Sequence, residues 1–281
     1  MLIQGDTGTG KQLVARAVYQ RSNRRERQFV TFNCGGFAEE LIANELFGHE
    51  KGAFTGANST KIGLLEAGNG GTVFLDEIGE MSLPMQAKLL HVIEEKRILR
   101  LGSTTPIDLD IRIIAATNRH LREMSRQGTF REDLYFRLNV VNIELPPLAQ
   151  RMEDLPLLIG HFVNIYNRQF GKNITSVSPE ATEILMSYDY PGNIRELENI
   201  LQRGLALSEE GMIRSKHLPE DIRHFSFASP DNRFLQSLAD MEKEHIMRVL
   251  KFTGGDRRLA ATILGLPRTT LCRRMKQYHL E

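Results

Sequence analysis

The sequence predicts an α/β protein in which a mainly parallel sheet carries helices on both faces, followed by a helical lid and a C-terminal helix-turn-helix. Three observations lead to this fold class. Five short β-rich runs alternate with helical patterns over residues 1–145, as in sheets built with crossover helices. A glycine-rich loop follows the first run, and beyond Pro147 helical periodicity replaces the strand patterns.

The predicted strands are residues 2–4, 29–33, 73–76, 111–117 and 140–145. The clearest helical patterns between them cover residues 13–21 and 83–95, and later ones cover 154–170, 180–187, 193–208 and 219–224. A small polar stretch around Pro230 is typical of a linker. We therefore expect an α/β subdomain at 1–148, a helical lid at 149–225, a linker at 226–233 and a C-terminal unit at 234–281. Ligands of a parallel sheet bind at the carboxyl ends of its strands.

A phosphate-loop pattern, G-x-x-x-x-G-K, follows the first strand. It comprises Gly5, Asp6, Thr7, Gly8, Thr9, Gly10 and Lys11. Its glycines allow a turn whose N–H groups point at phosphates, and Lys11 adds a positive charge beside a helix N-terminus. Gln12 stands where many such loops carry the Ser or Thr that ligates Mg²⁺, so another residue must help to hold the metal. A chance glycine-rich turn is the alternative, which the strand-loop-helix context makes improbable.

Two adjacent carboxylates, Asp76 and Glu77, end the apolar run 71–75. Because side chains alternate along a strand, the two cannot do the same work. Asp76 is expected to hold Mg²⁺, directly or through water, and Glu77 to orient and deprotonate an attacking water. A solvated acidic turn is the alternative. A glutamate beside the metal aspartate favours hydrolysis over transfer to another acceptor.

Composition is that of an ordinary soluble globular protein, with 41% hydrophobic and 25% charged residues in 281. The net charge of +1 excludes a polycation, but residues 251–281 carry a local excess of five positive charges. The basic residues there are Lys251, Arg257, Arg258, Arg268, Arg273, Arg274 and Lys276, against Asp256 and Glu281. This excess favours a polyanionic partner, with a solvated helical face as the alternative.

The remaining composition bears on location. Cys34 and Cys272 lack metal-site spacing and are expected to be free thiols in a reducing compartment. No apolar run approaches the ~20 residues that span a bilayer, and no signal peptide pattern is present. We therefore expect a cytoplasmic protein without a membrane partner.

The segment 45–57 reads ELFGHEKGAFTGA and ends in the core Gly52, Ala53, Phe54, Thr55, Gly56 and Ala57. On this segment the chain resembles bacterial enhancer-binding proteins, AAA+ ATPases with a Fis-type helix-turn-helix that activate RNA polymerase carrying sigma-54. The resemblance extends from residue 1 to about 280 and implies that these six residues contact sigma-54. Independently of the family, an aromatic ring on a glycine-flanked turn is better explained as a partner contact than as an ordinary core aromatic, which is the alternative.

The resemblance implies roles for five further residues. Asn33 would hold the catalytic glutamate until the γ-phosphate is sensed, and Asn118 would contact the γ-phosphate or the water. Arg131 and Arg137 would reach a neighbouring subunit's nucleotide as trans-acting arginines. Arg195 would close onto the phosphates from the lid. The alternatives are a strand-end turn for Asn33, a capping residue for Asn118 and surface salt bridges for the two arginines.

A helix-turn-helix is predicted near the C-terminus, with helices at 256–264 and 267–277 joined at Gly265. Its second helix carries Arg268, Thr269, Thr270, Arg273, Arg274 and Lys276. Residues near the start of that helix are expected to meet base edges, and the later basic ones to meet phosphates. A generic helical hairpin with a basic face is the alternative.

These features together predict an ATP-hydrolysing transcription activator that assembles as a ring, by resemblance a hexamer, with Mg-ATP between protomers. Hydrolysis would move the 52–57 loop, remodel the sigma-54 holoenzyme and open promoter DNA from a double-stranded enhancer site. The resemblance also implies two-component regulation. The alternatives are a DNA-binding regulator with a degenerate ATPase and an AAA+ machine acting on DNA or another protein.

The start of the chain departs from the resemblance. Members of the family carry a further stretch before the phosphate-loop strand, part of which packs against adenine, whereas this sequence opens almost directly on that strand. No receiver or sensory domain precedes it either. We therefore expect a fragment or a shortened gene product, in which nucleotide affinity, hexamer stability and regulation are open. The sequence leaves the operator, the target genes and the inducing signal undetermined.

Overall fold

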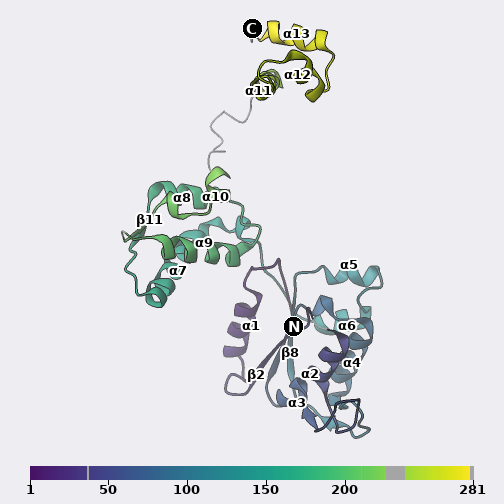
Figure 1. Ribbon diagram of the computed structural model, residues 1–281. Coiled ribbons are helices and arrows are strands. Elements are labelled where there is room, and N and C mark those ends of the chain that lie inside the picture. The colour runs from purple at the N-terminus through teal and green to yellow at the C-terminus, as the bar shows by residue number, and fades with distance from the viewer. Residues whose placement is uncertain (37, 210, 226–237, 279–281) are drawn as a thin grey trace. The chain divides into compact units, whose positions relative to one another are not determined.

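The computed structural model describes residues 1–36, 38–209, 211–225 and 238–278 (Figure 1). The chain forms two compact units, Met1–Pro219 and Glu220–Glu281. The predicted linker at 226–233 lies outside the described residues, and the predicted domain boundaries stay predictions. In the part of the chain that the structure describes, no helix is both long enough and apolar enough to cross a membrane.

A five-stranded parallel sheet forms the centre of the first unit, in the order β2-β5-β8-β1-β9. Its strands are β1 (Leu2–Gln4), β2 (Phe29–Asn33), β5 (Thr72–Asp76), β8 (Arg112–Thr117) and β9 (Asn142–Glu144). The helices of this region are α1 (Lys11–Gln20), α2 (Glu39–Phe47), α3 (Leu64–Ala67), α4 (Leu83–Glu95), α5 (Leu121–Arg126) and α6 (Glu132–Leu138). The predicted parallel α/β fold is therefore confirmed, and all five predicted strands form.

Helices cover both faces of the sheet because its strands alternate their side chains. Ile3, Phe74 and Ile114 point to one face, where α1 packs through Ala15. Leu2, Val73, Leu75 and Ala115 point to the other face, where they meet α2, α4 and α6. Figure 1 shows α1 on one side of the sheet and α4 and α6 on the other. The inner strands β1, β5 and β8 are mostly buried, which explains their nearly continuous apolar residues.

Two small hairpins extend from this α/β region. The antiparallel pair of β3 (Gly48–His49) with β4 (Lys61–Ile62) forms the stem of the loop that contains residues 52–57. The pair of β6 (Arg97–Ile98) with β7 (Ile107–Asp108) follows α4. A parallel bridge between His49 and Leu101 connects the two hairpins, so the 52–57 loop has a firm base.

A helical lid completes the first unit. It contains α7 (Leu155–Phe170), α8 (Pro179–Met186) and α9 (Asn193–Leu207), with short 3₁₀ turns at Leu148–Gln150, Met152–Asp154 and Ser215–His217. The expectation that strands stop after Pro147 is wrong in one detail, because β10 (Ser176–Val177) pairs with β11 (Met212–Ile213). Two-residue strands are too short to leave an alternating pattern in the sequence.

The second unit contains α10 (Glu220–Phe225), α11 (Leu238–Phe252), α12 (Arg257–Ile263) and α13 (Arg268–Gln277). The last three pack around a small core of Ile246, Val249, Ala260, Ala261, Leu271 and Met275. Asp256 caps α12 by accepting hydrogen bonds from Arg258 N and Leu259 N at 2.8 and 3.3 Å. Gly265 forms the turn in the left-handed region at φ 63°. The predicted helix-turn-helix is confirmed. Each of its two helices begins one residue later than predicted, because Asp256 is the N-cap of α12 and Pro267 is the N-cap of α13.

This small core yields a prediction for stability. Leu271→Ala removes a fully buried side chain, which costs about 2–5 kcal/mol. A unit with so few buried residues cannot absorb that loss. We expect the amides of α11–α13 to lose protection in hydrogen-exchange mass spectrometry, while β1, β5 and β8 keep theirs.

Leu259→Ala is the matched control for this experiment, because Leu259 lies on the adjacent helix and is 50% exposed. It should leave protection close to that of the parent. Equal protection in the two variants would contradict the assigned core.

Candidate active site

The phosphate-loop segment forms a closed turn between β1 and α1. Gly8 and Gly10 adopt left-handed conformations, with φ of 82° and 98°. The buried Thr9 hydroxyl donates to Asp6 O at 2.8 Å. The buried Lys11 donates from Nζ to Gly5 O at 2.8 Å and to Asp6 O at 3.2 Å. The ammonium group is therefore held over the loop, beside the N-terminus of α1, where an anion is favoured. Gln12 follows on the first turn of α1 and is exposed.

The two carboxylates lie at the end of β5. Asp76 Oδ1 accepts from Glu77 N at 3.0 Å. Glu77 itself takes the left-handed conformation, at φ 53° and ψ 44°, which costs a non-glycine residue free energy and is common at functional sites. Its Oε2 atom is buried and accepts no hydrogen bond from any described residue. A buried acceptor without a partner is unfavourable, so a water held at this oxygen would stabilise it.

Mg²⁺ also fits these residues. No group of three or more His, Cys, Asp or Glu side chains among the described residues could hold a metal ion by itself. Mg²⁺ bound to nucleotides does not need such a group, because it uses one or two carboxylates together with phosphates and water. Asp76, half-buried at the carboxyl end of β5, provides a carboxylate of that kind.

The two predicted asparagines lie at the carboxyl ends of β2 and β8, the two strands that flank β5 in the sheet. Asn33 ends β2 and is in register with Asp76. Its Oδ1 accepts from Gly35 N at 2.7 Å, so its side chain forms a local turn, and its hold on Glu77 stays a prediction. Asn118 follows β8, and its Nδ2 donates to Thr7 Oγ1 at 3.1 Å. The structure therefore brings Asn118 into direct contact with the phosphate loop.

The buried Cys34 follows Asn33 and reports on the local electrostatics. Its backbone N–H donates to Asp76 O at 2.8 Å. Burial, together with the carboxylates of Asp76 and Glu77, raises the pKa of the Cys34 thiol to about 12. The thiol is therefore protonated at neutral pH and is a poor nucleophile.

The lid reaches the phosphate loop through the turn before α9. A Cβ atom on Gly8 would lie 2.2 Å from Gly192 O and 3.2 Å from the Cβ of Arg195. The exposed Arg195 side chain therefore begins beside the loop, and its role toward the phosphates stays a prediction. Asn193 Nδ2 donates to Thr7 O at 3.0 Å. No sequence motif identified Asn193 as a site residue, because its only signal was its place after glycine at a helix start.

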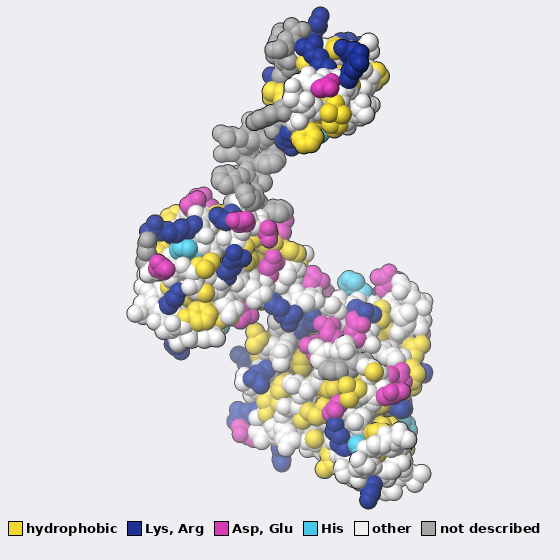
Figure 2. Space-filling view, in the orientation of Figure 1, with side chains coloured by type: hydrophobic (Ala, Val, Ile, Leu, Met, Phe, Trp, Pro, Cys, Tyr) yellow, Lys and Arg dark blue, Asp and Glu magenta, His cyan; other side chains and the backbone are white. Residues whose placement is uncertain are grey.

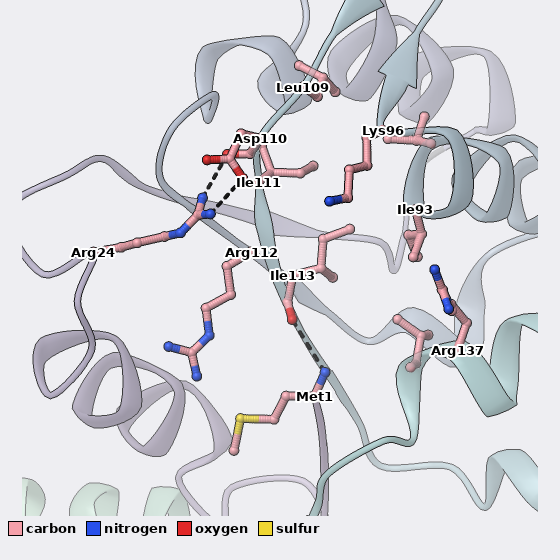
Figure 3. Close-up of a pocket in the computed structure, with 12 residues that line it drawn as sticks. Met1, Arg24, Ile93, Lys96, Leu109, Asp110, Ile111, Arg112, Ile113 and Arg137 are labelled. Carbon is pink, nitrogen blue, oxygen red and sulfur yellow. Dashed lines mark hydrogen bonds and ion pairs between the residues drawn. The ribbon is translucent and has the colours of Figure 1, made fainter.

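The two candidate trans-acting arginines lie at the start and in the last turn of α6. Arg131 caps α6, donates from its backbone N to Gln86 Oε1 at 2.8 Å, and forms a two-point ion pair with Asp133 at 3.0 and 2.6 Å. Arg137 lines a cavity of about 430 Å³ that also includes Arg112, at the start of β8, and Met1, which precedes β1 (Figure 3). The phosphate loop follows the end of β1, so Arg137 lies at the opposite edge of the sheet.

The 52–57 loop is a closed turn with an exposed tip. Gly52 and Gly56 adopt left-handed conformations, at φ 85° and 104°. Gly52 N donates to Ala57 O at 2.9 Å, and Ala57 is buried while Thr55 is exposed. Phe54 is 47% exposed and packs edge-to-face on His49 at 5.0 Å. Phe54 is therefore not a core aromatic, and its ring is available to a partner.

A charged cluster fixes the stem of this loop. Arg100 pairs with Glu50 at 2.7 Å and with Glu66 at 2.7 Å. Thr60 Oγ1 also donates to Glu50 Oε2 at 2.9 Å. The hydrogen bonds from Thr60 and Arg100, together with the positive charge of Arg100, hold the pKa of Glu50 below its usual value. The Glu50 carboxylate therefore stays charged at neutral pH. Sequence reasoning missed Arg100 because its partners are distant in the chain.

The basic helix α13 presents most of its predicted side chains to solvent. Arg268, Thr269, Arg273 and Lys276 are exposed, whereas Thr270 and Arg274 are half-buried. Arg274 Nη1 pairs with Glu242 Oε2 at 3.0 Å. Figure 2 shows dark-blue Lys and Arg side chains gathered on this unit. Such a surface suits a polyanion.

Three family profiles match consecutive parts of the chain. The sigma-54 interaction domain matches residues 1–144, the AAA+ ATPase lid domain matches 149–246, and the Fis family of bacterial regulatory proteins matches 237–278. Among solved structures, NtrX from Brucella abortus in complex with ATP is similar, at TM-score 0.74 and 34% identity, over 99% of this chain and 63% of that one.

Curated relatives are also similar over nearly the whole chain. The transcriptional regulatory protein ZraR of Escherichia coli (strain K12) is 46% identical over 277 residues, which are 99% of this chain and 63% of ZraR. The nitrogen fixation protein VnfA of Azotobacter vinelandii is 46% identical over 285 residues, covering 100% of this chain and 54% of VnfA. The chain thus spans less than two thirds of these relatives.

The close approach of lid and phosphate loop can be tested at Gly8. Gly8→Ala places a methyl group against Gly192 O, so the lid turn must move. The hydrogen bonds from Asn193 Nδ2 to Thr7 O and from Ile194 N to Gly8 O should both weaken. We expect a lower unfolding temperature and at least a tenfold loss of ATP affinity in calorimetry, because two such bonds correspond to about that factor.

Gly128→Ala separates the clash from backbone strain. Gly128 has a similar φ of 72°, but a Cβ there would meet nothing within 4 Å. It should lose stability by about 1 kcal/mol and keep ATP affinity. If Gly8→Ala also keeps the ATP affinity of the parent, the close contact between residue 8 and Gly192 O does not control nucleotide binding.

Proposed function

Because the chain belongs to the sigma-54 interaction domain family, with an AAA+ lid and a Fis-type helix-turn-helix, we propose that it is an ATP-hydrolysing transcription activator. One observation carries the proposal. One compact unit contains the phosphate loop, Glu77 and the lid residue Arg195, and Arg195 lies beside the phosphate loop. Glu77 lies at the same sheet edge and has a buried carboxylate oxygen without a hydrogen-bond partner among the described residues. This arrangement suits binding of a nucleoside triphosphate and activation of water.

In this proposal the phosphate loop and Lys11 bind the β- and γ-phosphates. Asp76 is the residue that would hold Mg²⁺, which supplies positive charge to the phosphates when bound. Glu77 orients the attacking water and accepts its proton at the carboxylate. Asn118, already bonded to Thr7, lies where it can contact the γ-phosphate or that water. Asn33 restrains Glu77 from the adjacent strand.

The subunits of a ring would complete each other's sites. Arg137 lies at the sheet edge opposite the phosphate loop, and Arg131 has its contacts with Gln86 and Asp133. The position of Arg137 does not suit the nucleotide of the same chain, and Arg131 has no hydrogen bond to its own phosphate loop among the described residues. Both arginines would instead stabilise transition-state charge on a neighbour's nucleotide, an effect worth about 10³–10⁵ in rate in other NTPases. We infer that copies of this chain assemble as a homo-oligomeric ring of six subunits.

The ring would act on transcription through two surfaces. The exposed Phe54 and Thr55 on the 52–57 loop are proposed to contact sigma-54, and hydrolysis would move this loop to remodel the polymerase. Helix α13 is proposed to bind double-stranded enhancer DNA. The proposal includes the division into an α/β subdomain (1–148), a lid (149–225), a linker (226–233) and a DNA-binding domain (234–281), a cytoplasmic location, and control by a two-component system.

The catalytic assignment predicts a separation of binding from turnover. Glu77→Gln should bind Mg-ATP with parent affinity, since the phosphate contacts remain, and should lose at least 100-fold in turnover because the general base is gone. Lys11→Ala should lose binding. Calorimetry and phosphate release measure the two quantities. Hydrolysis by Glu77→Gln at the parent rate would show that Glu77 is not the base.

The ring assignment predicts complementation between subunits. Arg131→Ala and Glu77→Gln should each be inactive alone. When mixed, they should recover part of the parent ATPase activity, because some interfaces then pair an intact Arg131 with an intact Glu77. The parent's activity per chain should also rise with protein concentration. No recovery in mixtures that are shown to co-assemble would remove the trans role.

A further inference from the structure

Asn193 is an unusual residue for the first position of a helix. It begins α9 at φ 54°, in the left-handed region, although it is not glycine. Its side chain is only 2% exposed. A buried amide in a disfavoured conformation persists only where the surrounding contacts hold it.

Those contacts use both ends of the amide. Asn193 Oδ1 accepts from Leu148 N at 2.7 Å, and Asn193 Nδ2 donates to Thr7 O at 3.0 Å. Leu148 lies in the segment that connects the sheet to the lid, and Thr7 lies in the phosphate loop. One side chain therefore joins three parts of the unit that are distant in the sequence.

The contact with Thr7 is the first of three in a row. Ile194 N donates to Gly8 O at 3.0 Å, and Arg151 Nη2 donates to Thr9 O at 3.0 Å. Three successive carbonyl groups of the phosphate loop thus accept hydrogen bonds from the lid region. Fixing the carbonyls fixes the peptide planes, and the N–H groups of such a turn form the concave anion site.

We propose that Asn193 is a positioning residue that presets the peptide planes of the phosphate loop for the β-phosphate. This inference rests on the proposed nucleotide site and adds to it that the lid, and not the loop alone, shapes the anion site. Asn193 does not touch the phosphates itself. It acts through Thr7, and the neighbouring lid donors act through Gly8 and Thr9.

The first test removes the amide without adding strain or charge. Asn193→Gly suits the left-handed conformation but loses both hydrogen bonds. We expect the affinities for ATP and ADP to fall about tenfold, and KM for ATP to rise with kcat within about twofold of the parent. Nucleotide affinity equal to that of the parent would overturn the proposal.

The second test uses protonation as a rescue. In Asn193→Asp, a protonated carboxyl can still accept from Leu148 N and donate to Thr7 O, whereas a carboxylate faces the Thr7 carbonyl with no proton to donate. Burial raises the pKa of such a carboxyl. The deficit in ADP affinity should therefore be largest at pH 8 and should shrink at pH 6.

Asn199→Asp is the matched control, since Asn199 is exposed on the same helix. It should bind ADP like the parent at both pH values. If Asn193→Asp shows no greater pH dependence than Asn199→Asp, Asn193 has no positioning role. Far-UV circular dichroism verifies that both variants are folded.

A third measurement needs no nucleotide and so separates this inference from the proposed function. In the nucleotide-free chain, the Leu148 amide should exchange at least tenfold faster in Asn193→Gly than in Asn199→Gly. If the parent binds no nucleotide, the proposed function fails and this comparison alone decides. Equal exchange in the two variants would overturn the role of Asn193.

Discussion

The structure depends on the close approach of two backbone segments, the phosphate loop at Gly8 and the lid turn at Gly192. A side chain at residue 8 would occupy the space of the Gly192 carbonyl oxygen, so the contact is between main chains. The lid donors that bond Thr7 and Gly8 follow from this approach. The conformation of the phosphate loop, the position of Arg195 and the position of the lid therefore depend on one another. Any ligand that moves the loop must also act on the lid.

The sheet separates the remaining chemistry between its two edges. Asp76, Glu77 and Asn118 lie at the carboxyl ends of their strands, beside the phosphate loop. Arg137 lies in the cavity at the other edge. The buried inner strands β1, β5 and β8 keep these two edges apart within one chain, because close-packed interiors resist bending. In the proposed ring, a second copy would bring its Arg137 edge to the phosphate loop of the first copy.

Sequence patterns predicted those features that are encoded locally. The buried strands left continuous apolar runs, and Gly265 with Pro267 marked the turn before α13. Strand order, by contrast, depends on packing between distant segments and left no local pattern. The contacts of Asn193 with Thr7 and of Arg100 with Glu50 join residues far apart in the chain, so no spacing rule could find them. The phosphate loop, Asp76 and Glu77 were identifiable because one short segment carries each function.

In the proposed function, ATP hydrolysis drives a partner through the 52–57 loop. The most direct measurement pairs ATP turnover with promoter opening by sigma-54 polymerase, on the same preparation of Thr55→Ala. Thr55 is exposed and has no hydrogen bond to the phosphate loop among the described residues. Ser59→Ala is the control, because it removes a hydroxyl from another exposed residue of the segment between β3 and β4. We expect Thr55→Ala to hydrolyse ATP within about twofold of the parent but to open no promoter, while Ser59→Ala does both. Parent-like promoter opening by Thr55→Ala, with turnover unchanged, would contradict the proposed function.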